Sequence, residues 1–237
     1  MANPTIYGTT TDTATAADIA TLAHDSGSGS NRVLKLWTST IHDGTGEGLA
    51  SITYNSVSMT NVAGASLEVA FGGRFGEVMF WYLIAPATGS NTIAFTYNSG
   101  TRRSVCVTAT TYEGAHQTTV IGVSNTTSGS SDTASFTETT TAVDSLLDMG
   151  FAIQGGDTEP FSPGTGDVEL SDLVSGTNTF LDHGHTNAYQ AATSTGSYTV
   201  SSTASVTDNT IAGVVEIIPV AAAGGPGAIM TANRGIW

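Results

Sequence analysis

The chain has 237 residues, a net charge of −14 and only 11% charged residues, against 39% hydrophobic ones. A composition this poor in Lys, Arg and Glu disfavours helices, whose surfaces these residues usually supply. Lys and Arg together number only six, so the chain offers no basic patch for phosphates, and we expect neither nucleic acid nor membrane partners. The length suits one large all-β domain with a sizeable core.

The N-terminal residues read as a lead-in that ends in a flexible Gly- and Ser-rich loop. The first clear strand covers residues 32–38, where Val33 and Trp37 share one face and Leu34 and Leu36 share the other. Apolar residues on both faces indicate a central strand that is covered on both sides.

Short strands then follow at regular spacing. Residues 67–71 alternate, and the segment 77–84 is the most apolar of the chain, so it is predicted to lie at the core. Its two faces are expected to carry Val78, Phe80, Tyr82 and Ile84 on one side and Met79, Trp81 and Leu83 on the other. Further strands are predicted over 50–55, 92–97, 103–112, 119–123, 134–137, 144–154, 196–207 and 211–220, with a loop over 126–132.

This series of short strands without a convincing helix is typical of an antiparallel sandwich or barrel. We predict an all-β fold, an antiparallel β-sandwich of jelly-roll type with about a dozen strands and extended termini. The sandwich domain would span residues 31–220. It would be preceded by the lead-in 1–30 and followed by a Gly/Pro-rich arm, 221–237.

One short segment resembles a metal site. Asp182, His183 and His185 would offer a carboxylate and two imidazoles, and the two histidines would share a face if the segment is extended. An ordinary surface turn around Gly184 explains the same residues, and no metal is expected. A solvated acidic loop is favoured over a calcium site for the carboxylates Asp157, Glu159, Asp167, Glu169 and Asp172.

Catalytic motifs are not apparent. Glu68 and Glu77 lie on neighbouring predicted strands and could form the facing carboxylates of a glycosidase, but each is expected to point to solvent. Cys106 lies in an alternating strand pattern and is expected to be a buried structural thiol. The sequence therefore predicts no catalytic residues, no cofactor and no enzymatic activity.

Aromatic residues leave a binding function open. Trp37, Trp81, Tyr82, Tyr97 and Tyr112 lie inside strand patterns, where aromatics usually belong to the core or to cross-strand pairs. A carbohydrate-binding face built from them is the alternative, so a glycan stays possible as a partner.

The C-terminal arm carries an apolar group after a Gly/Pro spacer. A spacer of about seven residues can reach about 23 Å when it is extended. Aromatic and Arg residues are the usual anchors of interfaces. The arm is therefore predicted to dock on a neighbouring subunit or virion protein through Ile229, Met230, Arg234, Ile236 and Trp237, with folding back over its own sandwich as the alternative.

Four segments together resemble jelly-roll or concanavalin-like β-sandwich modules of tailed-phage virion proteins and bacterial surface proteins. They are 52–60 (ITYNSVSMT), 81–93 (WYLIAPATGSNTI), 112–117 (YEGAHQ) and 213–219 (GVVEIIP). The resemblance covers most of the chain but rests on structural motifs, so it implies a fold and carries over no catalytic residue.

The resemblance implies a non-catalytic virion protein, such as a capsid decoration (cement) protein, a head fibre or a tail component. Its expected partners are other virion proteins and further copies of itself. The first residues lack a basic and then apolar leader, so synthesis in a host cytoplasm and a final location in the virion are expected. A carbohydrate-binding module or receptor-binding adhesin is the alternative.

Overall fold

The computed structural model describes residues 2–15, 17–71, 73–154, 161–175 and 183–221. These residues form 16 strands and one 3-10 turn, Ala63–Ala65, and the strands pair antiparallel. The predicted all-β, antiparallel sandwich is confirmed. The finer expectation of jelly-roll topology stays a prediction.

The strands form three sheets. The central sheet has the order β1 (Thr5–Thr15), β10 (Arg102–Glu113), β3 (Val33–His42), β8 (Arg74–Ile84), β6 (Thr60–Asn61), and β7 (Leu67–Phe71) also pairs with β8. The C-terminal sheet has the order β11 (Ile121–Thr139), β16 (Ser197–Ile217), β12 (Ser145–Gln154), β15 (His183–Ala192), β14 (Val168–Ser175), and β13 (Ser162–Pro163) pairs with β16. The small sheet contains β2 (Thr21–Asp25), β9 (Ser90–Tyr97), β4 (Leu49–Tyr54) and β5 (Val57–Ser58).

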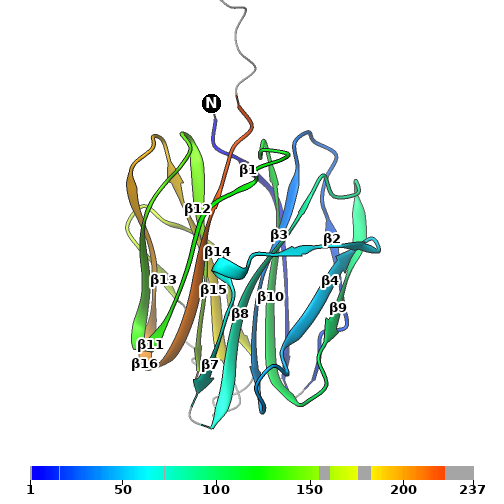
Figure 1. The fold of residues 1–237 in the computed structure, drawn as a ribbon, viewed down its shortest axis with the longest axis vertical. Helices are drawn as coiled ribbons and strands as arrows, with labels where there is room; N and C mark the ends of the chain where they lie inside the picture. Colours follow the sequence, from blue (N-terminus) through cyan, green and yellow to red (C-terminus); the bar gives the residue numbers. More distant parts are fainter. Residues whose placement is uncertain (1, 16, 72, 155–160, 176–182, 222–237) are drawn as a thin grey trace, which may run out of the picture.

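The central sheet lies between the other two, so both of its faces are covered (Figure 1). One apolar core joins it to the C-terminal sheet through residues such as Trp37, Phe80 and Val215. A second core joins its opposite face to the small sheet through residues such as Leu36 and Ile93. This double burial is the physical reason for the two-sided apolar pattern of β3.

A third core lies on the other face of the C-terminal sheet. The long strands β11 and β16 pair over most of their length; besides a shift near Ile121, the register changes between Ser131 and Thr133. Beyond that shift, Phe136 and Val200 pack in the same cluster as Phe151 of β12. The part of this strand pair beyond the shift therefore folds back over the sheet to which the rest of the pair belongs.

The predicted faces of β8 are confirmed. Val78 and Phe80, with Tyr82 and Ile84 packed against them, belong to the core shared with the C-terminal sheet. Trp81, with Met79 and Leu83, belongs to the core shared with the small sheet.

Two sequence-based assignments differ from the structure. The N-terminal residues are not only a lead-in, because β1 pairs with β10 and β2 pairs with β9 at sheet edges. The segment 126–132 is not a loop, because it continues β11 and pairs with β16. The segment 126–132 is rich in Thr, Ser and Gly, and an exposed strand of this composition has no apolar alternation to reveal it.

Candidate functional site

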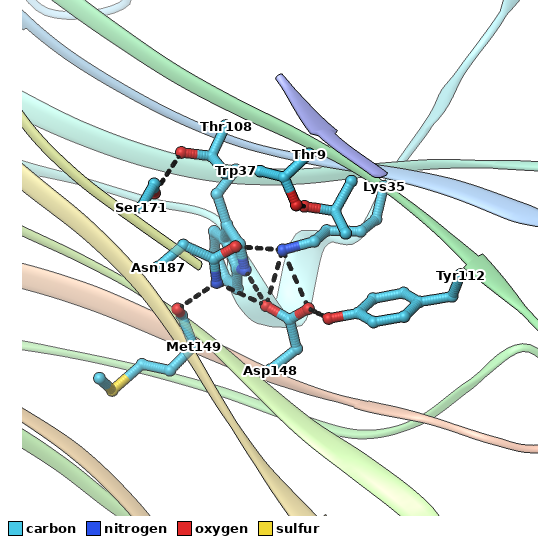
Figure 2. Close-up of polar contacts among 10 residues, drawn as sticks. Thr9, Lys35, Trp37, Thr108, Tyr112, Asp148, Met149, Ser171 and Asn187 are labelled. Atoms are coloured by element: carbon cyan, nitrogen blue, oxygen red, sulfur yellow. Dashed lines mark hydrogen bonds and ion pairs between the residues drawn. The ribbon is translucent and has the colours of Figure 1, made fainter. Parts of the chain in front are cut away.

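A cluster of polar side chains lies buried between the central and C-terminal sheets (Figure 2). Lys35 of β3 forms an ion pair with Asp148 of β12, with its Nζ 3.0 Å from Oδ2 and 3.1 Å from Oδ1. Both side chains are fully buried. The Lys35 ammonium also donates to the side-chain oxygen of Asn187 on β15.

Asp148 accepts hydrogen bonds from four side chains. Besides Lys35, these donors are Trp37 Nε1 at 2.7 Å, Tyr112 OH at 2.6 Å and Asn187 Nδ2 at 2.8 Å. Figure 2 shows all four donors converging on the carboxylate. A buried charge is tolerated only when it is paired and hydrogen-bonded, and this arrangement meets that condition.

The cluster is closed to solvent. Lys35, Trp37, Tyr112, Asp148 and Asn187 are each 0% exposed, so none of them can contact a substrate in this conformation. Burial lowers the pKa of Lys35, and the charge of Asp148 opposes that change. What the arrangement does chemically is to join β3 and β10 of one sheet to β12 and β15 of the other.

The predicted histidines lie close to this cluster rather than on the surface. His183 and His185 are both 0% exposed, and both contact the Ser39 hydroxyl, at 2.7 Å and 2.9 Å. The expected surface turn around Gly184 is wrong, because the segment is the start of β15. Its alternation does place both imidazoles on one face. Asp182 lies outside the described residues.

The His185 imidazole is neutral near pH 7. Its pKa is lowered to about 3, mainly by burial and in addition by the nearby His183 and Lys35. Ser104 contacts the other ring nitrogen of His183 at 2.6 Å. The two rings thus extend the polar layer between the sheets.

A second cluster of titratable groups lies at one end of the central sheet. His42, Glu68 and Glu77 each offer a ligand atom, and these atoms all lie within 4.8 Å of one another. No other such group of His, Cys, Asp and Glu is found in the part of the chain that the structure describes. These are the described residues that could hold a metal ion.

Glu68 and Glu77 do face each other across β7 and β8, as their strand positions suggested. The expectation that each points to solvent is wrong for Glu77, which is 5% exposed. Burial raises the pKa of Glu77 to about 7, its hydrogen bond from Leu49 opposes this change, and the charge of Glu68 adds to it.

The other candidate residues are Cys106 and the carboxylates of the expected acidic loop. Cys106 is buried, as predicted, and burial raises the pKa of its thiol. Asp172 accepts the Phe161 N–H at 3.0 Å, and Asp167 accepts the Ser201 N–H at 2.8 Å. Asp157 and Glu159 of the same expected acidic loop lie outside the described residues.

The strand aromatics do not form an open face. Trp37 and Tyr112 are 0% exposed and Trp81 is 6% exposed. Tyr82 and Tyr97, which are partly buried, pack against different cores. The five residues therefore do not share one surface on which a sugar ring could stack.

The predicted interface residues Ile229, Met230, Arg234, Ile236 and Trp237 lie outside the described residues. The structure does describe where this segment begins. Pro219 forms a bridge with Ala115, and the Val220 N–H donates to the Gly114 carbonyl at 2.7 Å. A surface pocket beside Val220 is lined by residues 2, 3, 5, 30, 113 and 114.

Comparisons with protein-family models, curated proteins and solved structures find no match for the chain. Among the described residues, no helix has the length and apolar character needed to cross a membrane.

The sequence alone did not reveal the Lys35 and His42 clusters. Lys35 is the only lysine of the chain and sits in an apolar strand. That position is the one signal that could have pointed to a buried ion pair. His42 carries no comparable signal, because its partners depend on which strands lie beside β3.

Proposed function

We propose that this protein is a non-catalytic structural protein of a tailed-phage virion, as a capsid decoration protein, a head fibre or a tail component. It acts through assembly contacts with other virion proteins and with further copies of itself. The proposal rests on the all-β sandwich, on the composition of the chain and on the way in which its last residues leave the fold.

The observation that carries the proposal is the anchoring of residues 218–220. The His116 N–H donates to the Ile218 carbonyl at 2.8 Å, and the Val220 N–H donates to the Gly114 carbonyl. The N-terminal residues begin at the same end of the sandwich (Figure 1). Residues 221–237 thus start from a fixed point on the fold.

The sequence of this C-terminal arm suits an interface. It carries Ile, Met and Trp side chains and one Arg beyond a Gly/Pro spacer, on a chain whose net charge is −14. Apolar and aromatic groups of this kind are a solubility liability unless a partner buries them. An acidic sandwich that repels copies of itself gains attachment from an arm of this composition.

The alternative, a carbohydrate-binding module or receptor-binding adhesin, has less support. Its aromatic platform would need Trp37, Trp81 and Tyr112 at the surface, and all three are buried. A glycan array probed with the full chain separates the two functions, since specific binding to a glycan favours the adhesin.

Mass spectrometry of purified particles, produced from the genome that encodes the chain, tests the proposal. We expect the chain in the particles at a copy number in fixed ratio to the major capsid or tail protein. A replication enzyme from the same genome serves as the control and should be absent. A chain that is found only in the soluble fraction of the lysate would contradict a virion role.

A further inference from the structure

Three strands of the central sheet bring a histidine and two glutamates together at the end opposite the start of β1 and the end of β16 (Figure 1). His42 is the last residue of β3, and it lies opposite Phe75 of β8. Glu77 of β8 lies opposite both Thr40 of β3 and Glu68 of β7. This register places an imidazole and two carboxylates on neighbouring strands with their ligand atoms within 4.8 Å.

The tautomer of His42 is fixed by its backbone partner. Nδ1 lies 2.8 Å from the Gly44 carbonyl, which can only accept, so Nδ1 carries a proton. Nε2 then points its lone pair toward the carboxylates, and it has no hydrogen-bond partner among the described residues. Metal-bound histidines almost always donate their second N–H to a carbonyl or carboxylate in this way.

Burial makes the orphaned nitrogen costly. The His42 side chain is 0% exposed, and the nearest charged atom to Nε2 is Glu68 Oε2 at 3.5 Å. A buried polar atom without a partner costs free energy, which the binding of a cation would remove.

The two carboxylates are held in place by the loop after β3 and by residues of β3 and β4. The Gly46 N–H donates to both oxygens of Glu68, at 2.9 Å and 3.2 Å. The Leu49 N–H donates to Glu77 at 3.0 Å, and the Thr40 hydroxyl donates to it at 3.3 Å. Within the described part of the chain, neither carboxylate has a Lys or Arg ion-pair partner. Two facing acids without a cation are unfavourable, because like charges directly opposite each other repel.

We propose that His42, Glu68 and Glu77 bind a divalent transition-metal ion of the Zn²⁺ or Mn²⁺ class. One imidazole nitrogen with carboxylate oxygens suits these ions, whereas Ca²⁺ and Mg²⁺ prefer sites made of oxygen alone. The Glu68 side chain is 22% exposed, so an ion can enter from its side. The ion joins β3, β7 and β8 and fixes the loop at 43–48.

The other way to supply positive charge is a proton on His42, which would leave an ordinary His–Glu ion pair. The two accounts differ in what the chain binds. Metal binding requires Zn²⁺ to be taken up in a one-to-one ratio, while the ion pair requires only a proton.

Isothermal titration of the chelator-treated full chain with Zn²⁺ alone tests the proposal, with thermal unfolding followed in parallel. We expect one equivalent of Zn²⁺ to bind and to raise the unfolding temperature. His42→Gln and Glu68→Gln should each weaken Zn²⁺ binding at least tenfold. The matched controls His116→Gln and Glu138→Gln remove an imidazole and a carboxylate elsewhere and should bind like the wild type.

Glu68→Gln keeps the test decisive if His42→Gln does not fold, because Glu68 is partly exposed. Absence of Zn²⁺ binding by the wild type would overturn the proposal, and so would binding that survives Glu68→Gln unchanged. Loss of binding in the two control variants would also overturn it, since it would show surface association.

Discussion

Lys35 and Asp148 lie 113 residues apart in the chain and meet between two sheets with no exposure to solvent. Such a pair is weak evidence for stability, because the cost of removing both charges from water offsets much of their attraction. The pair does, however, disfavour any packing in which the C-terminal sheet is displaced on the central sheet, because one buried charge would then lose its partner. The cluster therefore favours one register of the C-terminal sheet on the central sheet.

Removing both charges of this pair should cost clearly less than the two single removals added together. Lys35→Met leaves the Asp148 carboxylate buried without its cation, and we expect it to reduce the free energy of unfolding by about 3–5 kcal/mol. Asp148→Asn should cost a similar amount. The double variant should lose clearly less than the sum of the two.

Urea unfolding of the four proteins measures this coupling. Simple addition of the two single losses would contradict the account of Lys35 and Asp148 as one unit.

At the scale of elements, the contact between the two large sheets depends on a pair of glycines. Gly150 of β12 and Gly213 of β16 lie opposite each other, and both face the Trp37 indole of β3. A Cβ added at Gly213 would lie 2.8 Å from the indole and 2.9 Å from the Ala65 carbonyl. The indole cannot move freely, because its Nε1 is hydrogen-bonded to Asp148.

Gly213→Ala should therefore destabilise the protein by about 1–3 kcal/mol, since overpacking forces side chains or backbone to shift. Gly129→Ala is the matched control on β11, the strand that pairs with β16, because a Cβ at Gly129 meets no atom within 4 Å. Thermal unfolding of both variants checks the prediction. Equal unfolding temperatures for the two would show that Trp37 does not need the glycine pair.

The elements differ in how far the sequence could predict them. The two-sided apolar pattern of β3 and β8 predicted their central position, since burial on both faces favours apolar residues on both faces of a strand. The strand over 126–132 in β11 is not predicted, because exposed Thr, Ser and Gly residues give the same sequence pattern in a loop as in a solvent-exposed strand.

The polar clusters were harder to predict than the strands. His183 and His185 follow an alternation, but polar residues in an alternating strand usually face water. Here both side chains are buried and contact hydroxyl groups of the central sheet, such as that of Ser39. The partner of Lys35 depends on how sheets stack, which no local pattern encodes. The facing of Glu68 and Glu77 follows from their strands being neighbours, whereas the approach of His42 requires the order of strands in the sheet.

At the scale of the whole molecule, the described residues form three sheets with two polar clusters, and residues 218–220 are hydrogen-bonded to residues 114–120. The interior titratable groups link strands and sheets, and the strand aromatics are mostly buried. The sequence of residues 221–237 carries further apolar and aromatic groups beyond the Gly/Pro spacer. The proposed virion role places the binding function of the protein in this arm rather than on the sandwich.

Co-sedimentation of the chain with virus particles that lack it, with and without residues 224–237, tests this claim most directly. The account predicts that the shortened chain stays soluble and folded by circular dichroism but no longer sediments with the particles, while the full chain does. A shortened chain that attaches as well as the full chain would contradict the proposed role of the arm. Unfolding of the shortened chain would contradict it too, because the arm would then be packed on its own sandwich.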